Sequence, residues 1–186
     1  MLHIVYGGSA SGKSSYAESF AMSLQGEGRL LYIATMYPYK WNTTEIDPET
    51  MQRIERHRAM RADKGFDTVE CYRHVEHIVA KRQDVLLLEC MSNLLANEMY
   101  LEQDSDDGGL AETMSEVEKA GVGMSETLSP VSKKIVQALV NLSTRVQELV
   151  IVTNDVFSDG GSLTYDESTR EYVKNLAEIN LSLIHI

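Results

Sequence analysis

The chain has 186 residues, of which 43% are hydrophobic and 24% are charged, an ordinary composition for one globular domain. Its formal net charge of -11 disfavours general nucleic-acid binding, because phosphates are repelled by an acidic surface. Two cysteines give neither a disulfide framework nor a metal-ligand spacing, and neither a signal peptide nor a membrane-length apolar run is apparent. We therefore expect a single cytoplasmic domain over residues 1–180, with no nucleic-acid partner and no membrane span.

The first predicted strand covers residues 2–6 and leads into a glycine-rich octapeptide, Gly7-Gly8-Ser9-Ala10-Ser11-Gly12-Lys13-Ser14. This stretch fits the phosphate-loop pattern G-x-x-x-x-G-K-S/T at every fixed position, and residues 13–24 after it are predicted to be helical. Glycines let the backbone approach phosphate oxygens, and successive N–H groups form an anion-binding nest. We expect Lys13 to reach the β- and γ-phosphates of a nucleotide and Ser14 to bind Mg2+. A glycine-rich turn without a ligand is the weaker alternative.

Strands and helices alternate along the rest of the chain. Short apolar runs predict further strands at 30–34, 68–72, 84–89 and 149–153, and longer periodic segments predict helices at 47–61, 74–82, 91–101, 131–147 and 167–180. This order is typical of a three-layer α/β protein, and with the phosphate loop it predicts a P-loop NTPase-like fold with a mostly parallel central sheet. Residues 102–130 hold eight acids against one lysine, and we interpret them as an acidic, mobile insertion.

An acid ends the most apolar of the predicted strands. Glu89 follows Asp84-Val85-Leu86-Leu87-Leu88, where a Walker-B carboxylate would hold Mg2+ directly or through water. Acids at strand ends are common, so the prediction depends on the phosphate loop being present in the same chain.

The helix predicted at 47–61 carries three basic side chains on one face. Arg53, His57 and Arg61 are spaced by four residues, so they lie along one side of a helix. A neutral imidazole is a competent nucleophile towards phosphorus, and the arginines could bind the surrounding phosphate oxygens. Spacing alone favours the plainer interpretation, an exposed basic face with an incidental histidine. His74 and His77 have a spacing that could bind a metal, but no further ligand completes such a site.

Several short motifs occur in an order that resembles one family, the bifunctional adenosylcobinamide kinase/adenosylcobinamide-phosphate guanylyltransferases of cobalamin nucleotide-loop assembly. Besides the phosphate loop, the resemblance rests on Tyr32-Ile33-Ala34-Thr35, Arg53-Ile54-x-x-His57-Arg58-x-x-Arg61, Thr68-Val69-Glu70, Leu88-Glu89-Cys90 and Val152-Thr153-Asn154-Asp155-Val156. It covers the chain from residue 1 to about 180 apart from the acidic insertion, and it implies a parallel-sheet nucleotide-binding domain that assembles as a trimer.

The resemblance implies two reactions and the residues that perform them. His57 would attack the α-phosphorus of GTP, and the guanylyl group would then pass to adenosylcobinamide phosphate. A preceding kinase step would phosphorylate adenosylcobinamide from GTP or ATP, with Mg2+ as cofactor at Ser14 and Glu89 and with Lys13 as a catalytic residue. Nucleotide-binding positions implied outside the phosphate loop are Ala34, Thr35, Met36, Arg58, Ala59, Met60, Arg61, Glu70 and Glu89, with Arg53 and Asn154 in support.

Two alternatives stay open at this point. One is a small-molecule or nucleotide kinase without a covalent intermediate, and the other is a GTP-binding regulatory module without transferase chemistry. The family pattern continues beyond the last predicted helix, so we also expect residues 181–186 to be a non-native tail on a C-terminally truncated chain.

Overall fold

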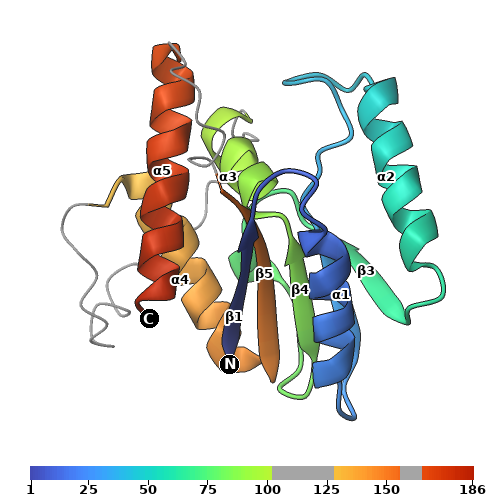
Figure 1. Cartoon of the computed structure of the whole chain (residues 1–186). Helices are drawn as coiled ribbons and strands as arrows, with labels where there is room; N and C mark the ends of the chain where they lie inside the picture. Colours follow the sequence, from blue (N-terminus) through green and yellow to red (C-terminus); the bar gives the residue numbers. More distant parts are fainter. Residues whose placement is uncertain (102–127, 156–164) are drawn as a thin grey trace.

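The structure is a computed structural model that describes residues 1–101, 128–155 and 165–186. Its centre is a five-stranded sheet in which every paired strand is parallel, in the order β1-β5-β4-β2-β3 (Figure 1). The strands are β1 (Leu2–Gly7), β2 (Leu30–Ala34), β3 (Phe66–Glu70), β4 (Val85–Glu89) and β5 (Glu148–Asn154). This architecture confirms the predicted α/β fold with a parallel sheet. The predicted acidic insertion lies outside the described residues except for its last three positions.

The inner strands β2, β4 and β5 form where the sequence has continuous apolar runs, because a parallel sheet is covered on both faces. In β4, Val85 to Leu88 are fully buried, and successive side chains enter different cores. Leu86 and Leu88 join the larger core, whereas Val85 and Leu87 join the smaller one. Consecutive residues of β4 are apolar because each face of this strand packs into a different core.

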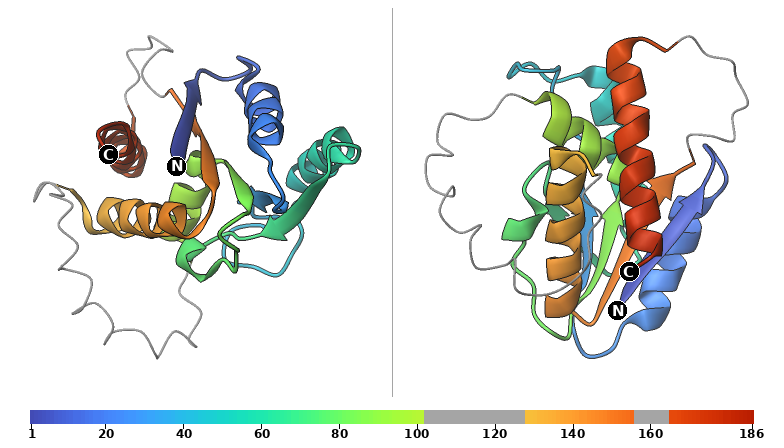
Figure 2. Two further views of the ribbon diagram at one scale, coloured as in Figure 1. Left: turned by 90° about the horizontal axis from the view of Figure 1, so that it is seen from below. Right: turned by 90° about the vertical axis from the view of Figure 1, so that its left-hand side faces the viewer.

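Helices cover both faces of the sheet and make three layers (Figure 2). The larger core lies under α3 (Met91–Tyr100), α4 (Pro130–Arg145) and α5 (Glu167–Ile184). On the opposite face, Ala17 and Ala21 of α1 (Lys13–Leu24) pack into the smaller core. Among the described residues, one further α-helix, α2 (Pro48–Arg61), connects β2 to the edge strand β3. In the described ranges, no helix combines the length and apolarity needed to cross a membrane.

One predicted helix and several predicted bounds differ from the structure. Helix α5 runs to Ile184, beyond the helix predicted at 167–180 and into the predicted tail. The prediction of a helix at 74–82 was wrong, because only a single 3-10 turn, η1 (Val75–His77), forms there. His74 has a left-handed backbone (φ 55°) and Ile78 is extended, so a helix can neither enter nor continue. The strand predicted at 68–72 lies two residues earlier, because its partner β2 pairs with Phe66 to Glu70.

The strand register brings the carboxyl ends together at one edge of the sheet. Gly7 pairs with Asn154, and Ala34 pairs with both Glu89 and Glu70. In open parallel sheets, ligands bind in the crevice outside these ends. The chain therefore gathers its glycine loop and its strand-end acids on the side where such a crevice forms.

Candidate nucleotide-binding site

The phosphate loop connects the end of β1 to the first turn of α1. Gly12 has a left-handed backbone (φ 82°), a conformation that a side chain would strain, and Tyr16 N–H donates to its carbonyl at 3.0 Å. Lys13 folds back over the loop, and its Nζ donates to the Gly8 carbonyl at 2.9 Å. The loop thus presents its lysine and the N-terminal end of a helix to the same space, an arrangement that suits phosphate.

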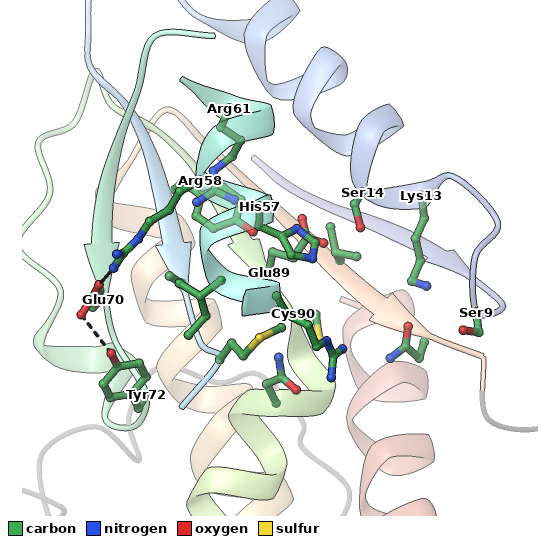
Figure 3. A pocket seen from close by; sticks show the side chains of 18 residues that line it. Ser9, Lys13, Ser14, His57, Arg58, Arg61, Glu70, Tyr72, Glu89 and Cys90 are labelled. Carbon is green, nitrogen blue, oxygen red and sulfur yellow. Dashed lines mark hydrogen bonds and ion pairs between the residues drawn. The ribbon is translucent and has the colours of Figure 1, made fainter. Parts of the chain in front are cut away.

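A cavity of about 250 Å³ opens beside this loop (Figure 3). The structure places most of the predicted site residues around it, although they come from distant parts of the sequence. The predicted residues that line it are Ser9, Lys13, Ser14, Ala34, Met36, Arg53, His57, Arg58, Arg61, Glu70, Glu89 and Asn154. The spacing prediction that Arg53, His57 and Arg61 share one face agrees with this placement, because all three line the same cavity.

Other predicted positions do not line the cavity. Thr35 is fully buried, and its hydroxyl bonds to the Cys90 backbone, donating to the carbonyl at 3.0 Å and accepting from the N–H at 2.7 Å. Thr35 therefore ties the ends of β2 and β4 together. Ala59 and Met60 are exposed on α2, with Met60 57% accessible. The remaining loop positions Gly7, Gly8, Ala10, Ser11 and Gly12 form the loop backbone without lining the cavity.

Glu89 lies between the phosphate loop and α2. Burial raises the pKa of Glu89, and the nearby Ser14 hydroxyl and His57 ring oppose that rise. His57 therefore shares the cavity with the loop that would hold a triphosphate, in contrast to the incidental surface histidine that spacing alone favoured.

The oxygen atoms at Ser14 and Glu89 are suitable ligands for Mg2+. Glu89 Oε2 is buried and has no hydrogen-bond partner among the described residues, so a cation would satisfy it. No group of three or more His, Cys, Asp or Glu side chains that could hold a metal occurs in the described ranges. Magnesium is commonly bound by one or two protein oxygens together with substrate phosphates and water, and this donor set fits that pattern.

Helix α2, which carries His57, is held on the sheet by cationic side chains. Its only buried residue is Arg61, whose Cζ lies 3.4 Å from the centre of the Tyr32 ring on β2. Arg61 is 5% exposed, and its Nε and Nη1 have no hydrogen-bond partner among the described residues. Nearby, Arg58 forms an ion pair with Glu70. Because few apolar contacts fix α2, the stacking of Arg61 on Tyr32 has a large share in setting the position of His57.

We expect Tyr32→Leu to loosen α2 while Tyr32→Phe does not, because phenylalanine keeps the aromatic face. A desolvated cation–π contact is worth about 2 kcal/mol, which corresponds to a ~30-fold larger population of the opened helix. Amide hydrogen exchange measures this effect, with β4 amides as an internal reference for global stability. Equal exchange of α2 in the two variants would show that the ring does not hold the helix.

Some cavity residues were missed by sequence reasoning. Tyr32 belongs to a predicted strand and to one of the family motifs, but it was not named as a site residue. Tyr72 lies beyond β3 and has no local signal, and its hydroxyl donates to Glu70 Oε2 at 2.9 Å. Asn93 could have been found, because it lies in the first turn of α3 directly after β4, where parallel-sheet crevices gather polar residues. Ile54, Cys90 and Val152 complete the missed part of the lining.

A phosphate loop after the first strand of a parallel sheet, facing an acid at the end of another strand, defines a P-loop nucleotide-binding protein. Comparison with known protein families shows to which family of P-loop proteins the chain belongs. The chain belongs to the cobinamide kinase / cobinamide phosphate guanyltransferase family, whose model matches residues 3–185.

Two curated relatives carry the same description, bifunctional adenosylcobalamin biosynthesis protein CobU. The protein from Escherichia coli K12 is 32% identical over 103 residues, which is 54% of this chain and 51% of the relative. The protein from Salmonella typhimurium LT2 is 33% identical over 104 residues, with the same shares. The chain thus spans about half the length of the curated relatives it matches.

Proposed function

We propose that this protein transfers a guanylyl group from GTP to adenosylcobinamide phosphate through a guanylyl-histidine at His57. The observation that carries the proposal is the shared cavity, in which His57 lies with Lys13 and Ser14 of the phosphate loop. Family membership supports the same reaction. A phosphate loop that served only hydrolysis or binding would leave a histidine in this cavity without a chemical role.

In the first half-reaction, a ring nitrogen of His57 attacks the α-phosphorus of GTP. A P–N bond forms, the bond to the bridging oxygen breaks, and pyrophosphate leaves with the electron pair. Lys13 and the N–H groups of the loop stabilise the negative charge that develops on the departing phosphates. Arg53 and Arg58 line the cavity beside the histidine and add positive charge near the transferred group.

In the second half-reaction, a phosphate oxygen of adenosylcobinamide phosphate attacks the guanylyl phosphorus. The P–N bond breaks and His57 returns to its free form, so the cycle consumes one GTP and releases one pyrophosphate. In the kinase reaction that precedes it, the same loop holds ATP or GTP while the acceptor hydroxyl attacks the γ-phosphorus and loses its proton. The bond to the β–γ bridging oxygen breaks, and the nucleoside diphosphate leaves. Glu89 and Ser14 would hold Mg2+, which neutralises charge on the phosphates when bound.

We also propose that the protein acts in the cytoplasm and as a homo-oligomer, with a trimer as the specific expectation from the family resemblance. Sedimentation velocity on the purified chain tests the oligomer directly. A single species with the mass of one 20.9 kDa chain at micromolar concentration would contradict it.

The proposed function is tested by supplying GTP and adenosylcobinamide phosphate and measuring both products. We expect one pyrophosphate for each guanylylated corrinoid, and phosphorylation of adenosylcobinamide when ATP or GTP is supplied with it. Corrinoid phosphorylation without any guanylyl product would show that the protein is a kinase without a covalent intermediate. GTP binding without either product would show that it is a regulatory module.

A further inference from the structure

A second and larger groove lies next to the nucleotide cavity. It measures about 1180 Å³ against about 250 Å³ for the first, and two residues, Glu70 and Tyr72, line both. One wall comes from the loop after β2, including Tyr37, and the other runs from the end of β3 past η1 to Val79. Because the walls are shared, a ligand lying in the groove could extend directly into the nucleotide cavity.

Aromatic rings cluster at this groove. Tyr37 lies 5.4 Å from Tyr72 and 6.4 Å from Trp41, and Trp41 lies 6.2 Å from Tyr100, all measured between ring centroids. Trp41 is 52% exposed although it belongs to this packed cluster. Aromatic faces left open beside a cavity are typical of sites that bind a flat apolar ligand.

Polar groups accompany the rings. Residues 42–44, an asparagine and two threonines, line the same groove close to Tyr37. Val79, at the far wall, is 87% exposed. The same wall also carries the basic residues Arg73, His74 and His77. A groove with aromatic faces and with amide, hydroxyl and basic groups beside them suits a ligand that is apolar over its ring and polar around its edge.

We propose that this aromatic groove, formed by Tyr37, Tyr72, Val79 and the adjoining Trp41, binds the corrin ring of the acceptor. The inference rests on the proposed function, which requires the protein to hold a corrinoid beside its nucleotide. A corrin is a large macrocycle with peripheral amides, and the nucleotide cavity is too small to hold it together with a nucleotide. The phosphate arm of the acceptor would pass Tyr72 and Glu70 to reach His57, as the positions of the three side chains in Figure 3 allow.

The single tryptophan of the chain provides a direct measurement, because corrinoids absorb light in the range where tryptophan emits. Adenosylcobinamide phosphate should quench Trp41 fluorescence saturably in the absence of GTP. We expect Tyr37→Ala to weaken this binding about tenfold, equivalent to ~1.4 kcal/mol for one lost ring contact. Binding of a fluorescent GTP analogue should stay unchanged, because Tyr37 does not line the nucleotide cavity.

Tyr16→Ala is the matched control. Tyr16 is 62% exposed on α1 and lines neither cavity, so its loss should leave corrinoid affinity at the wild-type value. Equal affinities of the Tyr37 and Tyr16 variants, or no saturable quenching of the wild type, would overturn the proposal. If Tyr37→Ala dissociates an oligomer and leaves corrinoid affinity unchanged, the groove is a contact between copies and the proposal is wrong.

Because this titration contains no GTP, it does not depend on the chemistry at His57. Failure of guanylyl transfer with intact quenching would overturn the proposed function and leave the groove assignment standing. If guanylyl transfer is normal and Tyr37→Ala has no effect on corrinoid affinity, the groove assignment is wrong and the proposed function stands.

Discussion

The His57→Ala variant is expected to carry no label after incubation with GTP labelled at the α-phosphate, whereas the wild type becomes labelled. A phosphorus–nitrogen bond to imidazole is acid-labile and alkali-stable, so the label should show both properties. Guanylyl transfer should fall by at least about a thousandfold, the scale on which loss of a covalent nucleophile acts. No other histidine lines the nucleotide cavity, so no neighbouring imidazole can take its place.

Two controls separate chemistry from folding. His57 is partly exposed on α2, so alanine there should leave unfolding free energy and GTP binding close to wild type. His185→Ala removes another accessible imidazole, one that lies outside both cavities, and should keep the full label. Label retained in His57→Ala would assign the nucleophile to another residue. Absence of label from a wild type that still phosphorylates corrinoid would rule out the covalent route.

The largest effect on stability is expected for Asp84→Ala, at the start of β4. Asp84 is 1% exposed and accepts hydrogen bonds from the Arg29 backbone N–H at 3.0 Å, from Arg29 Nη2 at 2.6 Å and from the Lys81 backbone N–H at 2.8 Å. Alanine removes the ion pair and leaves two backbone donors without their acceptor. Because Arg29 is 44% exposed, the cost comes mainly from the two backbone donors, at about 1–3 kcal/mol for each one left unsatisfied. The sum is a large part of the stability of a typical domain.

Urea unfolding at pH 7 measures this loss as a lower midpoint with an unchanged slope. The exposed pair Lys40–Glu45 is the control, since both side chains are at least half exposed and Glu45→Ala should cost less than about 1 kcal/mol. A loss below that value for Asp84→Ala would show that the network around Arg29 contributes little.

The Asp84 carboxylate also makes the free energy of unfolding depend on pH, in a direction that its pKa determines. Burial by itself raises the pKa of Asp84, but the hydrogen bonds from Arg29 and Lys81 outweigh it and hold the pKa below its ordinary value. A depressed folded-state pKa stabilises the protein above the unfolded pKa, about 3.9, and that stabilisation is lost as pH falls through the folded value. The difference in free energy of unfolding between the wild type and Asp84→Asn should therefore be constant near neutral pH and shrink only below about pH 4.

The fold could be predicted from sequence because its signals are local. Strands β1, β2, β4 and β5 contain apolar runs, and the phosphate loop needs only its own glycines, Lys13 and Ser14 to be recognised. The edge strand β3 has no such run, and its predicted bounds were displaced by two residues. The segment at 74–82 failed because its apolar spacing imitates a helix, whereas the backbone of His74 is left-handed and its N–H donates to Glu98 at 2.8 Å. Contacts of that kind, with a residue 24 positions away, leave no trace in a local pattern.

The sequence by itself determined that the chain is an α/β protein with a phosphate loop, and the family motifs named His57. Only the tertiary structure decided that His57 lies in the same cavity as that loop, that Arg61 is buried on Tyr32, and that Glu70 joins the cavity to a larger aromatic groove. Local patterns fix backbone conformation, because hydrogen bonding and burial repeat along a strand or helix. Strand order and helix placement depend on contacts between distant residues, so the site exists only once the sheet has assembled.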